Sequence, residues 1–195
     1  MKEVSERQLE IIESAGKILT VSGVSGLTIK NLAKEMSFSE SAIYRHFKSK
    51  EEIIVAMLDY IAYSLEERYH RIETSKLSPE EKLIVNFEIQ FTFFKEKPHF
   101  VAAVFTEGFM EENHRINQTI LKIMSQKVTH LLPIFKEGQE NNSFTNEIST
   151  EELMHIVMGA VRLQMFKWRV AKFEFDIVKN GNKIIQSLLQ LIKHK

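Results

Sequence analysis

The sequence contains no cysteine, only 7 glycines and 3 prolines, and very little aspartate. Without cysteine there is no disulfide framework, no thiolate zinc site and no cysteine nucleophile. Scarce glycine and proline leave few turns, which argues against an all-β fold of many short strands. Only Asp59 and Asp176 are aspartates among the 26 acidic residues. Because glutamate favours helix interiors more than aspartate does, the 195 residues are expected to form a mostly helical protein.

Long apolar runs are also missing. The longest, such as residues 53–58 and 156–161, are far too short to span a bilayer, and the polar N-terminus does not resemble a signal peptide. We therefore expect a cytoplasmic protein without a membrane partner. The net charge is zero, but it is unevenly distributed: residues 28–50 carry five basic side chains against two acidic ones.

Capping signals divide the chain into about nine helices, with no credible strand and no internal repeat. A serine, threonine or aspartate precedes most apolar helical patterns, often with glutamate or glutamine three residues later. Gly23 is expected to end the first helix. The expected caps are Ser5, Thr28, Ser39, Ser49, Ser78, Ser149 and Asp176. The predicted fold is all-α, with an N-terminal three-helix domain and a larger C-terminal helical bundle.

Residues 28–50 fit a helix-turn-helix. The first helix is predicted over Thr28–Met36, the tight turn over Ser37–Ser39, and the second helix over Glu40–Phe47. In such a unit the second helix enters the DNA major groove. An ordinary helical hairpin has the same spacing, but the shortness of these helices and the local positive charge favour DNA binding.

Two groups of side chains are expected at the DNA. The early residues of the second helix approach base edges, and an arginine there can bond guanine in a bidentate manner: Glu40, Ser41, Ala42 and Arg45. A second group is placed to contact phosphates, which fix register rather than sequence: Thr28, Tyr44, His46, Lys48 and Lys50.

From about Gln8 to Met57 the chain resembles the DNA-binding domain of the TetR/AcrR family of bacterial regulators. The resemblance rests on Ile11–Ala15, Gly23, Gly26, Thr28–Ile29, Leu32–Ala33, Ser39 and Ala42–Ile53. The block Ile43–Ile53 is the most specific, because the family's tyrosine, phenylalanine and Lys-x-Lys-Glu-Glu signature all stand in place. The chain departs from the family at Ser37, where the turn usually holds glycine. A left-handed backbone there costs serine more than glycine.

The resemblance implies a homodimer that binds a near-palindromic DNA operator, represses transcription and is released by a small molecule. It implies a DNA-binding domain over residues 1–50 and a ligand-binding and dimerisation domain over residues 51–195. It also implies that the last two long helices, about residues 149–172 and 176–194, build the dimer interface. We expect no cofactor, no metal and no catalytic residue.

Half of the 14 phenylalanines fall within residues 87–109. An aromatic-lined cavity between helices suits an apolar or aromatic effector, whereas aromatic stripes at helical spacing also simply pack as core. The residues expected to contact a ligand are Phe87, Phe91, Phe94, Phe105, Phe109 and Met124.

Small residues inside an apolar helix indicate the dimer interface, because they permit close helix approach. The same apolar faces alternatively bury against the chain's own bundle. The expected interface residues are Ile156, Gly159, Ala160, Phe166, Ile184 and Leu188.

Two other functions are compatible with the sequence. Glu-x-x-His occurs at Glu67, Glu111 and Glu152, and helical di-metal carboxylate enzymes use two such pairs facing inward. The other is a DNA-binding factor without an effector.

Overall fold

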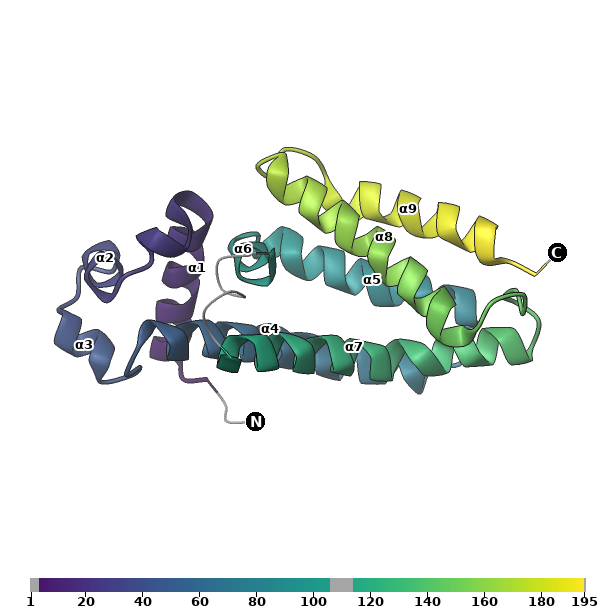
Figure 1. Cartoon of the computed structure of the whole chain (residues 1–195), viewed down its shortest axis with the longest axis horizontal. Coiled ribbons are helices and arrows are strands. Elements are labelled where there is room, and N and C mark those ends of the chain that lie inside the picture. The colour runs from purple at the N-terminus through teal and green to yellow at the C-terminus, as the bar shows by residue number, and fades with distance from the viewer. Residues whose placement is uncertain (1–3, 106–113, 195) are drawn as a thin grey trace. The chain divides into compact units, whose positions relative to one another are not determined.

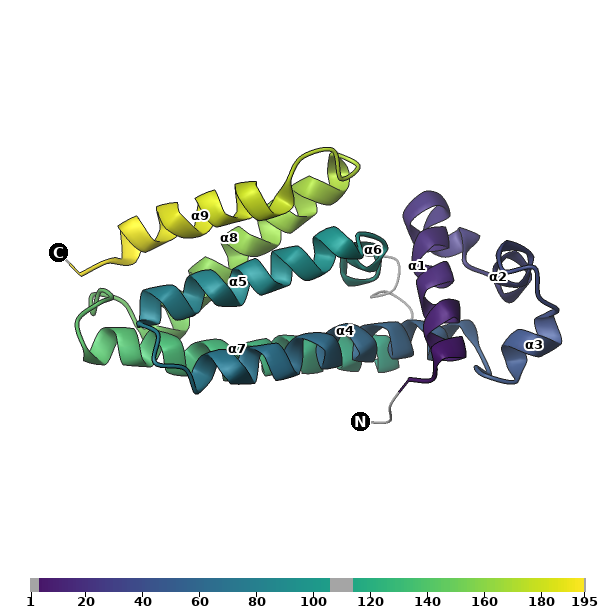
Figure 2. The same cartoon turned by 180° about the vertical axis from the view of Figure 1, so that it is seen from behind.

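The structure is a computed structural model that describes residues 4–105 and 114–194. These residues form nine α-helices and no strand, which confirms the predicted all-α fold (Figure 1, Figure 2). Phe144 and Lys193 form only an isolated bridge. The helices are α1 (Glu6–Gly26), α2 (Ile29–Glu35), α3 (Glu40–Tyr44), α4 (Lys50–Glu73), α5 (Pro79–Glu96), α6 (His99–Phe105), α7 (His114–Glu140), α8 (Thr150–Val170) and α9 (Ile177–Ile192).

The predicted helix starts are confirmed by hydrogen bonds at the caps. Ser5 with Gln8, and Ser149 with Glu152, form reciprocal capping boxes at the starts of α1 and α8. The side chain of Asp176 accepts the backbone N–H of Lys179 at the start of α9. These side chains satisfy backbone donors that a helix N-terminus otherwise leaves unpaired.

Helix ends agree less well with the prediction. Gly23 interrupts α1 with a positive φ of 65°, as expected, but helical residues resume and continue to Gly26. The prediction that the second helix of the helix-turn-helix reaches Phe47 was wrong, because α3 ends at Tyr44. After Tyr44, the Ile43 carbonyl accepts the N–H groups of both His46 at 2.9 Å and Phe47 at 3.1 Å, and residues 45–46 form a turn. α7 contains Pro133 and continues to Glu140.

Contacts within the chain define two compact units. The first comprises residues 1–64 and 97–123, and its α1 packs on α6. Gly16 of α1 permits this close approach, since a Cβ there would lie 2.8 Å from the ring of His99. The Lys97 ammonium donates to Glu13 at 2.5 Å and to the Tyr60 hydroxyl at 3.3 Å, so polar bonds accompany the apolar contact.

The second unit comprises residues 65–96 and 124–195, and α9 packs on both α5 and α8. Gly181 of α9 lies directly under the ring of Phe91 of α5. Around this core, Lys82 pairs with Glu137 at 2.7 Å, and the Trp168 N–H donates to the Phe175 carbonyl at 2.8 Å. Several phenylalanines, among them Phe87, Phe91 and Phe94, are buried in this unit.

The predicted division into residues 1–50 and 51–195 concerns function and stays a prediction, because the compact units follow packing and not chain order. None of the helices in residues 4–105 and 114–194 combines the length and hydropathy that a bilayer-spanning segment needs.

Replacing Ser37 by glycine is expected to raise the free energy of unfolding by about 0.5–1 kcal/mol, because Ser37 has a φ of 55° and glycine adopts this left-handed region without strain. Urea denaturation measures the change. Ser125→Gly, at an exposed position inside α7, is the matched control and should instead lower stability by about 0.5–1 kcal/mol. A destabilised Ser37→Gly protein would contradict this reading of the turn.

Candidate nucleic-acid interface and effector site

The helix-turn-helix is held together by backbone and capping bonds. The Thr28 hydroxyl accepts the N–H of Asn31 at 3.1 Å, and the Ser39 hydroxyl accepts that of Ala42 at 3.2 Å. In the turn between them, the Phe38 N–H donates to the Ala33 carbonyl at 2.8 Å. The geometry fixes the direction in which α3 leaves the turn.

Most side chains predicted at the DNA are exposed to solvent on this unit. Ala42 and Lys50 are half-buried, and the exposed residues are Thr28, Glu40, Ser41, Tyr44, Arg45, His46 and Lys48. The Lys50 ammonium donates to the Val24 carbonyl at 3.2 Å. A phosphate contact by Lys50 therefore exchanges an existing internal bond for a new one.

A surface pocket of about 230 Å³ lies beside α3 and brings together residues far apart in the sequence. It is lined by Arg7, Phe38, Ala42, Arg45 and His46. The guanidinium of Arg7 lies 5.0 Å from the centroid of the Phe38 ring and also pairs with Glu10. Sequence reasoning missed Arg7, because only the folding of α1 against the turn places a second guanidinium next to Arg45.

The phenylalanines predicted to line an effector cavity lie in different places. Phe87, Phe91 and Phe94 are buried in α5, in the second unit. Phe105 is buried in the first unit, Met124 is 46% exposed, and Phe109 lies outside the described residues. Their assignment as ligand contacts stays a prediction.

A polar cluster that the sequence analysis did not single out lies beside Phe87. The Lys127 ammonium of α7 is 3.9 Å from the ring centroid of Tyr69 and 4.7 Å from that of Phe87. It donates to the side-chain carbonyl of Asn86. Asn86 is fully buried, and its Nδ2 group has no hydrogen-bond partner among the described residues.

Burial dominates the electrostatics of this cluster. Burial lowers the pKa of Lys127 well below its usual value. The pKa of Tyr69 is raised, first by burial and then by the negative charge of Glu66. Among the described side chains, no carboxylate lies within ion-pair distance of Lys127.

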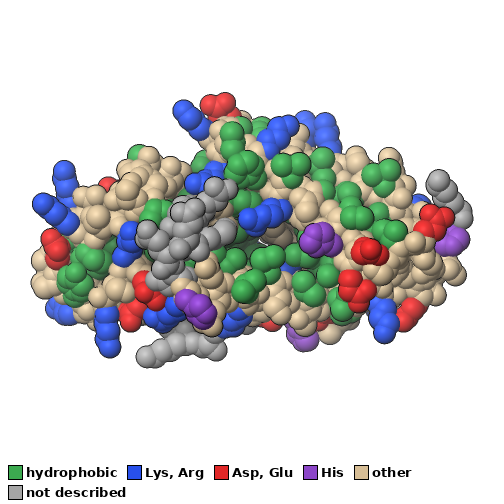
Figure 3. Space-filling view, in the orientation of Figure 1, with side chains coloured by type: hydrophobic (Ala, Val, Ile, Leu, Met, Phe, Trp, Pro, Cys, Tyr) green, Lys and Arg blue, Asp and Glu red, His purple; other side chains and the backbone are tan. Residues whose placement is uncertain are grey.

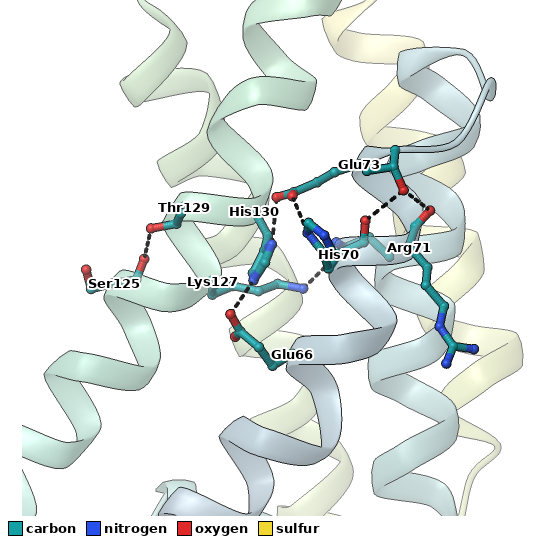
Figure 4. Close-up of polar contacts among 10 residues, drawn as sticks. Glu66, His70, Arg71, Glu73, Ser125, Lys127, Thr129 and His130 are labelled. Carbon is teal, nitrogen blue, oxygen red and sulfur yellow. Dashed lines mark hydrogen bonds and ion pairs between the residues drawn. The ribbon is translucent and has the colours of Figure 1, made fainter. Parts of the chain in front are cut away.

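His130, one helical turn after Lys127, has carboxylates on both sides. Its Nδ1 lies 2.6 Å from Glu73, and its Nε2 lies 3.1 Å from Glu66. Figure 4 shows Lys127 and His130 reaching from α7 toward α4, with His130 between the two glutamates. These two carboxylates are therefore engaged by histidine, which leaves Lys127 with a neutral partner.

The Glu-x-x-His pairs do not come together in the parts of the chain that the structure describes. His70 and His155 are exposed, and Glu111 lies outside the described residues. Across residues 4–105 and 114–194, no group of three or more His, Asp or Glu side chains is arranged to hold a metal ion.

Comparison with known families decides the classification. A family model described as bacterial regulatory proteins of the tetR family matches residues 11–57, and one described as the C-terminal region of YsiA-like proteins matches residues 61–191. The chain belongs to the TetR family. This TetR-family protein is thus a DNA-binding transcriptional regulator, and the helix-turn-helix described above is its DNA-binding unit.

Individual relatives cover nearly the whole TetR-family chain. The nucleoid occlusion factor SlmA of Vibrio cholerae is 27% identical over 186 residues, 93% of this chain and 91% of its own. The fatty acid degradation regulator FadR of Bacillus halodurans superposes with a TM-score of 0.86 at 18% identity, covering 100% of both chains. The transcriptional regulator FadR of Bacillus subtilis, solved in complex with stearoyl-CoA, superposes with a TM-score of 0.80 at 19% identity. The match covers 93% of this chain and 97% of that chain. At such identities the two superpositions show the fold alone.

Proposed function

We propose that this protein is a homodimeric repressor that binds a near-palindromic operator through α3 and is released by an effector with an apolar acyl chain. The α2–α3 unit supports the DNA-binding part of the proposal. Its packing residues Leu32, Ala33 and Ile43 are buried, while most of the residues predicted to contact DNA are exposed. An ordinary hairpin inside a bundle would not leave such a basic face exposed.

The proposed dimer interface rests on an apolar face of α8 that is largely exposed to solvent. Ile156, Leu163, Phe166 and Val170 are 52%, 67%, 44% and 65% exposed and share one side of the helix. A Cβ added at Gly159, on the same side, would meet no atom within 4 Å. Figure 3 shows hydrophobic side chains gathered over the region of α8 and α9. A continuous exposed apolar patch of this kind indicates a protein partner, and a second copy of this chain is the one proposed.

The proposed effector class rests on the aromatic interior of α5 and on the relatives. Phe87, Phe91 and Phe94 provide apolar surface in the second unit. Two structures with the same fold are fatty acid degradation regulator FadR and the B. subtilis FadR bound to stearoyl-CoA. An acyl chain matches such a site because apolar pockets with a few polar groups bind apolar ligands.

Selection of binding sites from random duplex DNA tests the proposal. A palindrome with half-sites about one helical turn apart, roughly 34–36 Å, is expected from the purified protein. Dodecanoyl-CoA and dodecanoate are then added to the selected complex. Operator binding without release by either compound would favour the DNA-binding factor without an effector, and no enriched sequence would contradict operator recognition.

Arg45→Ala is expected to change the selected consensus, because an arginine on the recognition helix reads guanine through two hydrogen bonds. Lys48→Ala is the matched variant for a phosphate contact. It should weaken binding to all sequences alike and reduce the slope of log K against log salt by about 0.9. Both are measured by duplex selection and by anisotropy titration at several salt concentrations. An unchanged consensus for Arg45→Ala would show that the predicted register of α3 on the DNA is wrong.

A further inference from the structure

We infer that the effector carries a free carboxylate, which Lys127 and Asn86 bind inside the second unit, so that the ligand is an apolar carboxylic acid. This inference rests on the proposed effector-controlled function and specifies the polar end of the ligand. It concerns residues of α4, α5 and α7 that all belong to one compact unit.

The Lys127 ammonium places a basic group inside the second unit. An ammonium group is costly to bury unless an anion compensates it. Two other buried basic side chains of the second unit have carboxylates beside them: Lys82 pairs with Glu137 at 2.7 Å, and His130 lies between Glu66 and Glu73. Among the described side chains, those that contact the Lys127 ammonium are the neutral amide of Asn86 and the faces of two aromatic rings. An anion bound here would compensate the charge of Lys127.

The side-chain amide of Asn86 has unused hydrogen-bonding capacity. Asn86 accepts a bond from Lys127 with its oxygen, and its buried Nδ2 donors have no partner among the described residues. Buried polar groups are usually paired, so an unpaired amide beside an unpaired cation needs an explanation. One carboxylate satisfies both, because one oxygen accepts from the ammonium and the other from the amide.

The surroundings of the Lys127 ammonium are aromatic. Phe87, whose ring lies 4.7 Å from the ammonium, begins the row of buried phenylalanines on α5. An acid bound at Lys127 would therefore place its carbon chain beside the ring of Phe87. Burial lowers the pKa of Lys127, and a carboxylate beside the ammonium would raise that pKa again by stabilising the charged form.

A thioester presents a different chemistry to the same residues. Its carbonyl accepts a hydrogen bond but brings no charge to the ammonium. In a thioester of coenzyme A, the negative charges lie on the phosphates, away from the acyl end. The cluster therefore favours the free acid over the thioester and over the alcohol of the same chain length.

Calorimetry with sodium dodecanoate, dodecanol and dodecanoyl-CoA tests the inference on the full-length protein without DNA. Dodecanoate is expected to bind at least about tenfold more tightly than dodecanol, because a charge-assisted bond contributes more than a neutral one. Equal affinity for acid and alcohol would overturn the inference.

Lys127→Met is expected to lose at least about tenfold in affinity for dodecanoate, keep its affinity for dodecanol, and unfold at a higher temperature than wild type. Lys136→Met, which removes an exposed lysine of the same helix, is the matched control and should bind as wild type. Unchanged dodecanoate affinity in Lys127→Met would contradict the proposed contact.

Asn86→Asp gives an independent check that keeps the shape of the site. The new carboxylate pairs with Lys127 inside the protein and competes with the ligand, so dodecanoate binding should fall while dodecanol binding stays. If operator binding is normal but dodecanoate does not bind, the regulator function stands and the carboxylate site is wrong. If neither DNA nor acid binds, the proposed function fails as well.

Discussion

Replacing Leu163 by glutamate is expected to convert the proposed dimer into monomers and to weaken operator binding by about a hundredfold or more. Leu163 is 67% exposed in the single chain, so the fold does not need it. In a dimer that buries the apolar face of α8, the new carboxylate would lie unpaired in an apolar interface. Such a charge costs roughly 3–5 kcal/mol, and about 3 kcal/mol corresponds to a hundredfold change in the dissociation constant.

Sedimentation velocity measures the oligomeric state, and fluorescence anisotropy with the selected operator measures DNA binding. Gln190→Glu, at an exposed position of α9, adds the same charge outside the apolar face and should leave both unchanged. A Leu163→Glu protein that stays dimeric would show that the two copies meet elsewhere. Circular dichroism and thermal unfolding establish that the monomer is folded.

Helix starts were predictable because they depend on short-range hydrogen bonds. Ser149 and Glu152 lie three residues apart, and their reciprocal bonds form wherever the chain starts a helix. The end of α3 was not predictable in the same way. The residues after Tyr44 continue a plausible helical pattern, but α3 ends at Tyr44 and a turn leads to the buried Phe47.

Lys127 left a signal in the sequence that was overlooked. Ile116, Ile120, Ile123 and Leu131 follow the three- and four-residue spacing of an apolar helix face, and Lys127 occupies the position between Ile123 and Leu131. A cation in an apolar stripe indicates either a long side chain reaching solvent or a functional buried charge. The neighbours that decide between these, Tyr69 and Asn86, come from two other helices. The sequence alone therefore cannot supply the decision.

The phenylalanine row illustrates a second limit. Spacing placed Phe87, Phe91 and Phe94 on one helix, and all three are buried. Spacing does not show what faces each ring. Phe91 packs on the backbone of Gly181, ninety residues further along the chain, whereas Phe87 lies next to the ammonium of Lys127. The two rings thus have different surroundings, and Phe91 contributes to the α5–α9 packing.

Gly181→Val should test that packing with a large loss of stability. A Cβ at position 181 would lie 2.4 Å from Cε2 of Phe91, well inside van der Waals contact, and the Phe91 ring is fully buried and cannot turn aside. Overpacking of this kind costs about 1–3 kcal/mol. We expect a loss at the upper end of that range, measured by urea denaturation at fixed protein concentration, because stability of an oligomer depends on concentration.

The double variant Gly181→Val with Phe91→Leu separates steric overlap from other effects. Phe91→Leu removes as many carbon atoms as Gly181→Val adds, and volume-conserving changes in a core usually cost less than about 1.5 kcal/mol. Phe91→Leu alone leaves a cavity and should be destabilised. The double variant should therefore be more stable than the sum of the two single effects predicts, since the residues are in contact. If the two losses of unfolding free energy simply add, the ring of Phe91 is not the reason that position 181 requires glycine.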